Sequence, residues 1–271
     1  MRFDPTTMKT RSLFGSSQEC KEYRAYVEGD DPRFIDWNVY ARTERTYVRR
    51  YEGETNTRLT IVLDASASMG YGSHGITKLQ YAKYLAAAFA YLAARQHDPV
   101  GLIVFDEQVR QYRPPTSRSG GLAGIIHAID GVQAGSGTDL IGCFQRFREH
   151  LQRRGLVIVI SDLYCDPDSM SKAVQPLAYR GHDIALFQLL DPQELRPEWR
   201  DAVLLQDMET GQSLNVSPEY LATEYRDRLQ SHLASLRTAA AQARAHQALI
   251  ATDEPLDRAL RRYLLFRQGR N

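Results

Sequence analysis

Four short apolar runs that each end at an aspartate constrain the fold of this chain more than any other feature of its sequence. They cover residues 59–63 before Asp64, 100–105 before Asp106, 156–160 before Ser161-Asp162, and 184–190 before Asp191. Runs that are apolar almost throughout and rich in β-branched residues are typical of strands buried on both faces. We therefore expect four strands of a parallel sheet that helices cover on both sides.

The segments between these runs have the spacing of amphipathic helices. One apolar stripe consists of Leu79, Ala82, Leu85, Ala86, Phe89 and Ala93, and another of Leu122, Ile125, Ile126 and Ile129. Two further helices are expected over residues 139–150 and 169–180. Strands that alternate with helices predict an α/β fold with a doubly wound, mostly parallel sheet. In such sheets the ligand site lies beyond the carboxyl ends of the strands, where Asp64 and Asp162 fall.

The two ends of the chain differ from this pattern. Residues 1–57 are polar, and only 47–52 alternate apolar and charged side chains as a half-buried strand does. Ser217-Pro218 is a helix start, because the hydroxyl can cap the helix and proline suits its first turn. A long amphipathic helix is expected after it, and a last one over 254–266. The predicted domains are an N-terminal extension packed on the core (1–57), an α/β domain (58–216) and a C-terminal helical extension (217–271).

The composition excludes several classes of protein. The 271 residues carry 34 Lys and Arg against 33 Asp and Glu, and this net charge of +1 argues against a general nucleic-acid binder. No apolar run approaches the ~20 residues that cross a bilayer, and the first residues lack the apolar centre of a signal peptide. The three cysteines are widely spaced and form no C-x-x-C pair. We therefore expect a cytoplasmic protein with free thiols and no integral membrane segment.

Oxygen-bearing side chains follow the predicted strands at their carboxyl ends. The turn Asp64-Ala-Ser66-Ala-Ser68 can bring a carboxylate and two hydroxyls to one side, and Thr138 and Asp162 come from two other strand-end loops. Mg²⁺ prefers oxygen ligands and usually retains several waters. The turn by itself also fits hydroxyls that cap the next helix, and Thr138 also fits a helix N-cap. The three loops together favour a metal site.

These five residues resemble the metal-ion-dependent adhesion site of von Willebrand factor A domains, whose pattern is D-x-S-x-S, a G-T-D-L loop and a later S-D-L. The resemblance implies that hydroxyls bind Mg²⁺ or Mn²⁺ directly and that one or both aspartates act through water. A cation held mainly by neutral hydroxyls keeps positive charge and an exchangeable position, which suits a carboxylate of another protein. Tyr71 and His74 are expected to form the rim of this partner-binding site, with the 113–120 loop also beside it.

Residues 24–42 hold a second pattern, R-x-Y-x-x-G-D-D-x-R-x-I-D-W-x-x-x-A-R. Its arginines and acids can form bidentate pairs, and paired catalytic carboxylates are the alternative. The predicted structural clasp consists of Arg24, Asp30, Asp31, Arg33, Asp36, Trp37 and Arg42. The string resembles the signature of the bacterial family catalogued as domain of unknown function fifty-eight, and the likeness covers most of residues 15–215. It implies a MoxR-type AAA+ ATPase, or a client of that ATPase, as the partner.

Enzyme motifs are incomplete in this sequence. The segment from Gly70 begins like a phosphate-binding loop, but Ile76 stands where the pattern needs lysine. The sequence has neither G-x-S-x-G nor H-E-x-x-H. We predict a non-enzymatic adaptor for a MoxR-type ATPase in folding, activation or complex assembly, which binds a partner's carboxylate through Mg²⁺. The alternatives are a Mg²⁺-dependent phosphoester hydrolase and a structural protein that binds no metal.

Overall fold

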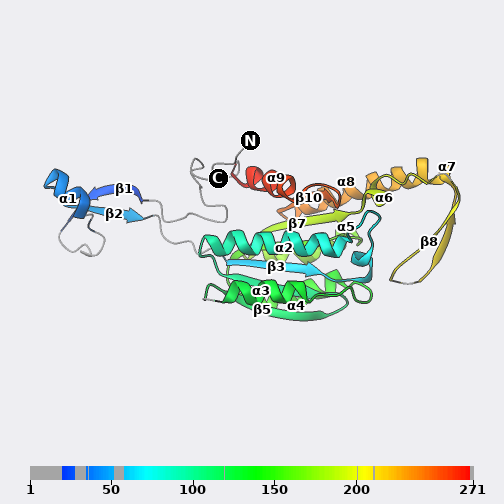
Figure 1. Cartoon of the computed structure of the whole chain (residues 1–271), viewed down its shortest axis with the longest axis horizontal. Helices are drawn as coiled ribbons and strands as arrows, with labels where there is room; N and C mark the ends of the chain where they lie inside the picture. The colour runs from blue at the N-terminus through cyan, green and yellow to red at the C-terminus, as the bar shows by residue number, and fades with distance from the viewer. Residues whose placement is uncertain are drawn as a thin grey trace. The chain divides into compact units, whose positions relative to one another are not determined.

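The chain forms two units in the computed structural model, which describes residues 20–27, 35, 37–51, 58–118, 120–199, 201–209 and 211–268 (Figure 1). Unit 1 covers Met1–Asn56, and unit 2 covers Thr57–Asn271. Unit 1 contains strand β1 (Cys20–Ala25), helix α1 (Trp37–Thr43) and strand β2 (Tyr47–Tyr51). The two strands pair in antiparallel fashion, so the strand predicted at 47–52 is confirmed.

Unit 2 is built on a six-stranded sheet with the order β10-β7-β6-β3-β4-β5. Its strands are β3 (Arg58–Asp64), β4 (Val100–Phe105), β5 (Val109–Thr116), β6 (Gly155–Ser161), β7 (Asp183–Leu190) and β10 (Ala245–Ala251). All neighbours are parallel except β5, which pairs antiparallel with β4 at one edge. The four predicted strands are confirmed as β3, β4, β6 and β7. They are buried along almost their whole length, as their apolar sequences require.

Helices cover both faces of this sheet (Figure 1). They are α2 (Lys78–Arg95), α3 (Gly121–Asp130), α4 (Leu140–His150), α5 (Pro167–Tyr179), α8 (Arg226–Gln242) and α9 (Leu256–Gln268). Helices α4, α5 and α8 share one apolar core with Val157 and Leu186. On the opposite face Phe89 of α2 and Tyr263 of α9 pack on Phe187, with ring centroids 5.1 Å and 4.9 Å away. The predicted doubly wound α/β fold is confirmed.

The ends of several helices follow their capping residues. Helix α5 begins at Pro167, two residues before the predicted start, because the Asp166 side chain accepts a hydrogen bond from the Ser169 N–H. The predicted start at Ser217 is confirmed, since its hydroxyl accepts from the Tyr220 N–H. Helix α7 (Pro218–Tyr220) continues through a π-helical turn, η3 (Leu221–Tyr225), into α8. Within the described residues, no helix is both long and apolar enough to span a membrane.

Strands that the sequence analysis did not predict complete the unit. Strand β5 carries Pro114 and Pro115, which an edge strand tolerates and a central strand does not. Strands β8 (Val203–Gln206) and β9 (Ser213–Val216) form a separate antiparallel hairpin. Strand β10 begins just after Arg244, whose left-handed backbone (φ 58°) follows the end of α8. The C-terminal segment is therefore not only helical, because β10 extends the central sheet beside β7.

Candidate functional site

The carboxyl ends of β3 and β6 bring the two predicted aspartates to one place. Asp64 ends β3, Asp162 follows the last residue of β6, and each side chain is about 1% exposed. The Ser161 hydroxyl donates a hydrogen bond to Asp64 Oδ2 at 2.6 Å. The two strands are neighbours in the sheet, so the sheet itself places both carboxyl groups at one edge.

The turn after β3 places both predicted serines on the same side as Asp64. The Ser66 N–H donates to Asp64 Oδ1 at 2.8 Å, and this bond turns the chain into the short 3₁₀ helix η2 (Ala67–Gly70). The hydroxyl oxygens of Ser66 and Ser68 lie 3.1 Å apart. The Ser66 hydroxyl makes no capping hydrogen bond to η2. The alternative prediction, that this hydroxyl caps the next helix, is therefore wrong.

A third loop is hydrogen-bonded to this turn. The Ala67 N–H donates to the Ser136 carbonyl at 2.6 Å, and the Gly135 N–H donates to the Ala65 carbonyl at 2.7 Å. These bonds connect segments that are about seventy residues apart in the chain. The three predicted loops therefore meet at the carboxyl edge of the sheet.

Thr138 lies in this third loop with an unused oxygen. Its Oγ1 atom is buried and has no hydrogen-bond partner among the described residues. The alternative role as a helix cap is wrong, because Asp139 caps α4 by accepting a bond from the Gly142 N–H at 2.8 Å. A buried hydroxyl without a partner costs free energy, so an additional ligand at this oxygen would stabilise the protein.

Lys78 adds a buried cation that the sequence analysis did not assign. Its side chain is 1% exposed, and its Nζ atom lies 2.9 Å from Asp162 Oδ2 and 2.7 Å from Glu194 Oε1. The Tyr164 ring lies beside it, with the centroid 5.2 Å from Nζ. Burial alone would lower the pKa of Lys78, but the charges of Asp162 and Glu194 outweigh it and raise that pKa. Lys78 therefore stays charged.

A signal for Lys78 was present in the sequence. It lies on the buried face of α2, four residues before Ala82 and seven before Leu85. A lysine within an apolar stripe needs a buried partner, and the two partners of Lys78 come from the end of β6 and from the segment after β7. Glu194 had no comparable signal, because its place depends on α6 (Pro192–Leu195), which the sequence analysis did not predict.

The carboxylates at this edge outnumber the cations that face them. Burial, and then the negative charge of Asp162, raise the pKa of Asp64 to about 7. Burial likewise raises the pKa of Glu194, although Lys78 opposes this shift. Lys78 compensates one charge, so ionisation of both aspartates leaves a negative surplus that a divalent cation would offset.

The donor set fits a hydroxyl-rich Mg²⁺ site. It combines the side-chain oxygens of Asp64, Ser66, Ser68, Thr138 and Asp162, and the Thr138 oxygen is the unpartnered one. In the described part of the chain, no group of three or more His, Cys, Asp or Glu side chains could hold a metal by itself, so the hydroxyl oxygens would be part of any such site. The residues therefore suit a hard cation that keeps waters rather than zinc or iron.

Glu209 reaches the same edge from the turn of the β8–β9 hairpin. Its Oε2 accepts from the Thr138 N–H at 3.2 Å, and Glu209 lines the same groove as Ser68. Burial and the nearby charge of Asp162 raise the pKa of Glu209. Sequence reasoning missed this residue, because the hairpin is short, mostly exposed and far along the chain from the site.

The two predicted rim residues lie differently. Tyr71 is half-buried and lines the same groove as Ser68 and Glu209. His74 instead contacts Asp191, with Nδ1 3.3 Å from Oδ2. The Ser73 hydroxyl and N–H also bond Asp191, so that aspartate fixes the loop. The role of Tyr71 and His74 in partner binding stays a prediction.

The predicted clasp falls in unit 1 and is only partly described. Asp30, Asp31, Arg33 and Asp36 lie outside the described residues, as does the side chain of Arg24. Trp37 is 62% exposed and its ring is edge-on to Tyr40, with centroids 6.1 Å apart. Arg42 is exposed at the end of α1. The ion-pair clasp therefore stays a prediction.

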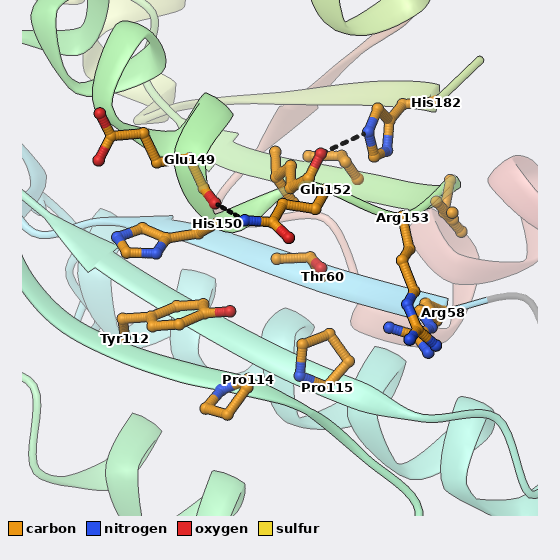
Figure 2. Close-up of a pocket in the computed structure, with 14 residues that line it drawn as sticks. Arg58, Thr60, Tyr112, Pro114, Pro115, Glu149, His150, Gln152, Arg153 and His182 are labelled. Carbon is orange, nitrogen blue, oxygen red and sulfur yellow. Dashed lines mark hydrogen bonds between the residues drawn. The ribbon is translucent and has the colours of Figure 1, made fainter. Parts of the chain in front are cut away.

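A separate pocket of about 330 Å³ lies at the amino ends of the parallel strands, the edge opposite the candidate site (Figure 2). It opens beside Arg58 and Thr60 at the start of β3, and His182 Nε2 donates to the Leu151 carbonyl there at 3.1 Å. Residues 113–116 belong to this edge, because β5 runs antiparallel to β4 and Arg113 pairs with Leu102. The expectation that the 113–120 loop flanks the metal site is therefore wrong.

Comparison with known proteins gives one family match. The family described as "Protein of unknown function DUF58" matches residues 22–239. Uncharacterized proteins of Mycobacterium tuberculosis and Mycobacterium bovis are 30% identical to this chain over 203 residues, which cover 73% of the chain and 62% of each relative. The chain thus spans less than two thirds of the length of these relatives.

Solved structures with the same fold have little sequence in common with this chain. BatB of Bacteroides thetaiotaomicron has a TM-score of 0.53 and 14% identity, covering 79% of this chain and all 100% of BatB. An aerotolerance-related membrane protein of Bacteroides fragilis has a TM-score of 0.52 and 15% identity. The match covers 78% of this chain and 99% of that protein. The SpRpn10 VWA domain has a TM-score of 0.44 and 11% identity. The match covers 76% of this chain and 95% of that domain. The two structures with TM-scores above 0.5 support the doubly wound α/β fold class of unit 2.

Proposed function

The chain belongs to the DUF58 family, and we propose that it is a non-enzymatic interaction module that binds an acidic side chain of a partner protein through Mg²⁺ or Mn²⁺. The observation that carries the proposal is the convergence of three loops on one edge of the sheet. That edge presents two buried aspartates, two adjacent serine hydroxyls and a threonine oxygen that has no hydrogen-bond partner in the described part of the chain.

Each residue has a separate part in this proposal. The cation would be contacted by the neutral hydroxyl oxygens of Ser66, Ser68 and Thr138. The carboxylates of Asp64 and Asp162 would balance its positive charge. The bound cation supplies an electrophilic position that a carboxylate can fill. Ser161 holds Asp64 by its hydrogen bond, and Lys78 holds Asp162, so both carboxylates are fixed in place.

The family resemblance supports the proposed partner and setting. We propose that a MoxR-type AAA+ ATPase, or a client of that ATPase, supplies the acidic side chain. The module would then act as an adaptor in folding, activation or complex assembly in the cytoplasm. Nucleotide hydrolysis would belong to the ATPase, since the phosphate-loop pattern of this chain lacks its lysine.

Calorimetric titration with Mn²⁺ tests the site directly. The wild type should bind one Mn²⁺, and Ser66→Ala/Ser68→Ala should weaken binding at least about tenfold. The exposed pair Ser231→Ala/Ser235→Ala on α8 is the matched control and should bind as the wild type does. Equal Mn²⁺ binding by both double variants would contradict the proposed site.

Capture from a lysate of the source organism tests the partner. A protein should be retained by the wild type with Mg²⁺, and lost with a chelator or with Ser66→Ala/Ser68→Ala. Retention under all conditions would contradict metal-dependent binding. Mg²⁺-dependent turnover of p-nitrophenyl phosphate, abolished by Asp64→Ala, would instead support the hydrolase alternative.

A further inference from the structure

We propose that Glu209, in the turn of the β8–β9 hairpin, is an intramolecular ligand of the candidate metal site and occupies the place of a partner's carboxylate. The inference rests on the proposed function, because it gives one of the chain's own residues the role proposed for the partner. The hairpin stands beyond the carboxyl ends of the parallel strands, on the side of the candidate site (Figure 1).

The position of the Glu209 carboxylate carries the inference. Oε2 lies 3.2 Å from the Thr138 backbone nitrogen, and Glu209 lines the same groove as Ser68. It also lies 3.7 Å from where a side chain at Gly137 would begin. The carboxylate thus contacts the loop that carries Thr138, whose side-chain oxygen has no hydrogen-bond partner among the described residues.

The turn of the hairpin is built to present this side chain. Asp207 accepts from the Glu209 N–H through Oδ1 at 2.7 Å and from the Gly211 N–H through its carbonyl at 2.9 Å. Gly211 has a φ of 73°, a left-handed conformation that favours glycine. The adjacent Met208 methyl lies 3.8 Å from where a side chain at Gly70 would begin, so the turn also meets η2.

A carboxylate at this place is unfavourable without a cation. Asp64 and Asp162 already concentrate negative charge there, and Lys78 pairs with Asp162 and Glu194 rather than with Glu209. A divalent ion bound at the candidate site would offset these negative charges and attract the Glu209 carboxylate. Metal binding should therefore hold the hairpin on the site more firmly.

The hairpin has few buried side chains and is not part of the central sheet. It forms its own two-stranded sheet, and its Leu204 and Leu214 side chains are 69% and 58% exposed. A groove of about 900 Å³, lined by Tyr71, Tyr164 and Leu205 among others, lies between the hairpin and the site. Few buried contacts would be lost on opening, so a partner's acidic side chain could replace Glu209.

Glu209→Gln tests the proposal in the full-length chain. Glutamine keeps the size of the side chain and an oxygen for the Thr138 N–H, but it removes the charge. Calorimetry should show Mn²⁺ affinity about tenfold weaker than in the wild type. Hydrogen exchange of the amides of residues 203–209 and 211–216 should slow on adding Mn²⁺ to the wild type and stay unchanged in Glu209→Gln. Asp201→Asn, an exposed acid just before the hairpin, is the matched control.

The outcomes separate this inference from the proposed function. Weaker Mn²⁺ binding and loss of the metal-dependent protection in Glu209→Gln alone would support both. Mn²⁺ binding by the wild type that Glu209→Gln leaves unchanged, with the same hairpin exchange, would overturn the inference and leave the proposed function standing. A wild type that binds no Mn²⁺ would overturn the proposed function and the inference with it.

Discussion

Lys78 has its ammonium group buried between Asp162 and Glu194, where helix α2 begins. A buried ion pair gains little overall, but removing one partner leaves the other charge without compensation. The geometry of the site at the scale of single residues thus depends on a side chain that is not one of the five predicted metal ligands. Its loss should affect stability before it affects binding.

Lys78→Met should lower the free energy of unfolding by about 3–5 kcal/mol, because Asp162 and Glu194 stay buried without their cation. Urea unfolding of the purified variant measures this change. The exposed Lys172→Met on α5 is the control and should cost less than about 1 kcal/mol. A loss of similar size in both variants would show that Lys78 does not compensate the buried acids.

Asp64 predicts a pH dependence in metal-free buffer. Its pKa of about 7 lies above the ordinary value of 3.8, so between these values the folded protein holds a proton that the unfolded chain has lost. The free energy of unfolding should therefore fall as pH rises through this range, on the order of 2–4 kcal/mol in total. Urea unfolding with a chelator at pH 5, 6 and 7 measures the slope. Asp64→Asn should lack most of it, and an identical slope in both proteins would contradict this origin.

Helix α9 is the last described helix of unit 2, and it packs against α2 and β7. Its Tyr263 ring packs edge-on against Phe89 and Phe187, with centroids 5.5 Å and 4.9 Å away. Leu265, two residues later, is 61% exposed. The helix therefore contacts the core through one face, and the two residues offer a matched comparison.

Tyr263→Ala should lower the free energy of unfolding by about 3–5 kcal/mol, since it leaves a cavity between α2, α9 and β7. Leu265→Ala should change it by less than about 1 kcal/mol. Thermal or urea unfolding of the two variants makes the comparison. Equal losses would mean that α9 does not depend on this aromatic contact.

At the scale of the whole molecule, unit 2 contains the complete sheet and both helical layers. Its six strands lie between residues 58 and 251, and the candidate site draws all its side chains from this unit. Unit 1 forms a separate two-stranded ribbon. The sheet domain should therefore fold without the first unit.

A chain that begins at Thr57 should unfold in one cooperative transition and keep the Mn²⁺ affinity of the full chain within about threefold. Circular dichroism and calorimetry check the two parts of this prediction. Loss of cooperative unfolding would show that residues before Thr57 contribute to the core. Loss of Mn²⁺ binding in a folded truncation would place part of the site in unit 1.

The central strands and the five candidate ligands could be predicted from the sequence because the patterns that indicate them are local. Each apolar run needs only its own residues to show burial on both faces, and the turn after Asp64 brings its serines together through neighbouring bonds. Strand β5 with its two prolines, the β8–β9 hairpin and β10 lack such signals. Their places depend on contacts with strands or loops distant along the chain.

The amino-acid sequence by itself determined the parallel sheet, its covering helices and the edge at which oxygen-bearing side chains gather, because hydrophobic burial fixes which segments become central strands. Only the tertiary structure decided which charges meet at that edge. Lys78, Glu194 and Glu209 come from a helix, a short turn and a hairpin, and their pairing depends on distances between segments that no local pattern encodes. Buried charges and hydrogen bonds act over a few ångströms, so the chemistry of the site depends on the packing.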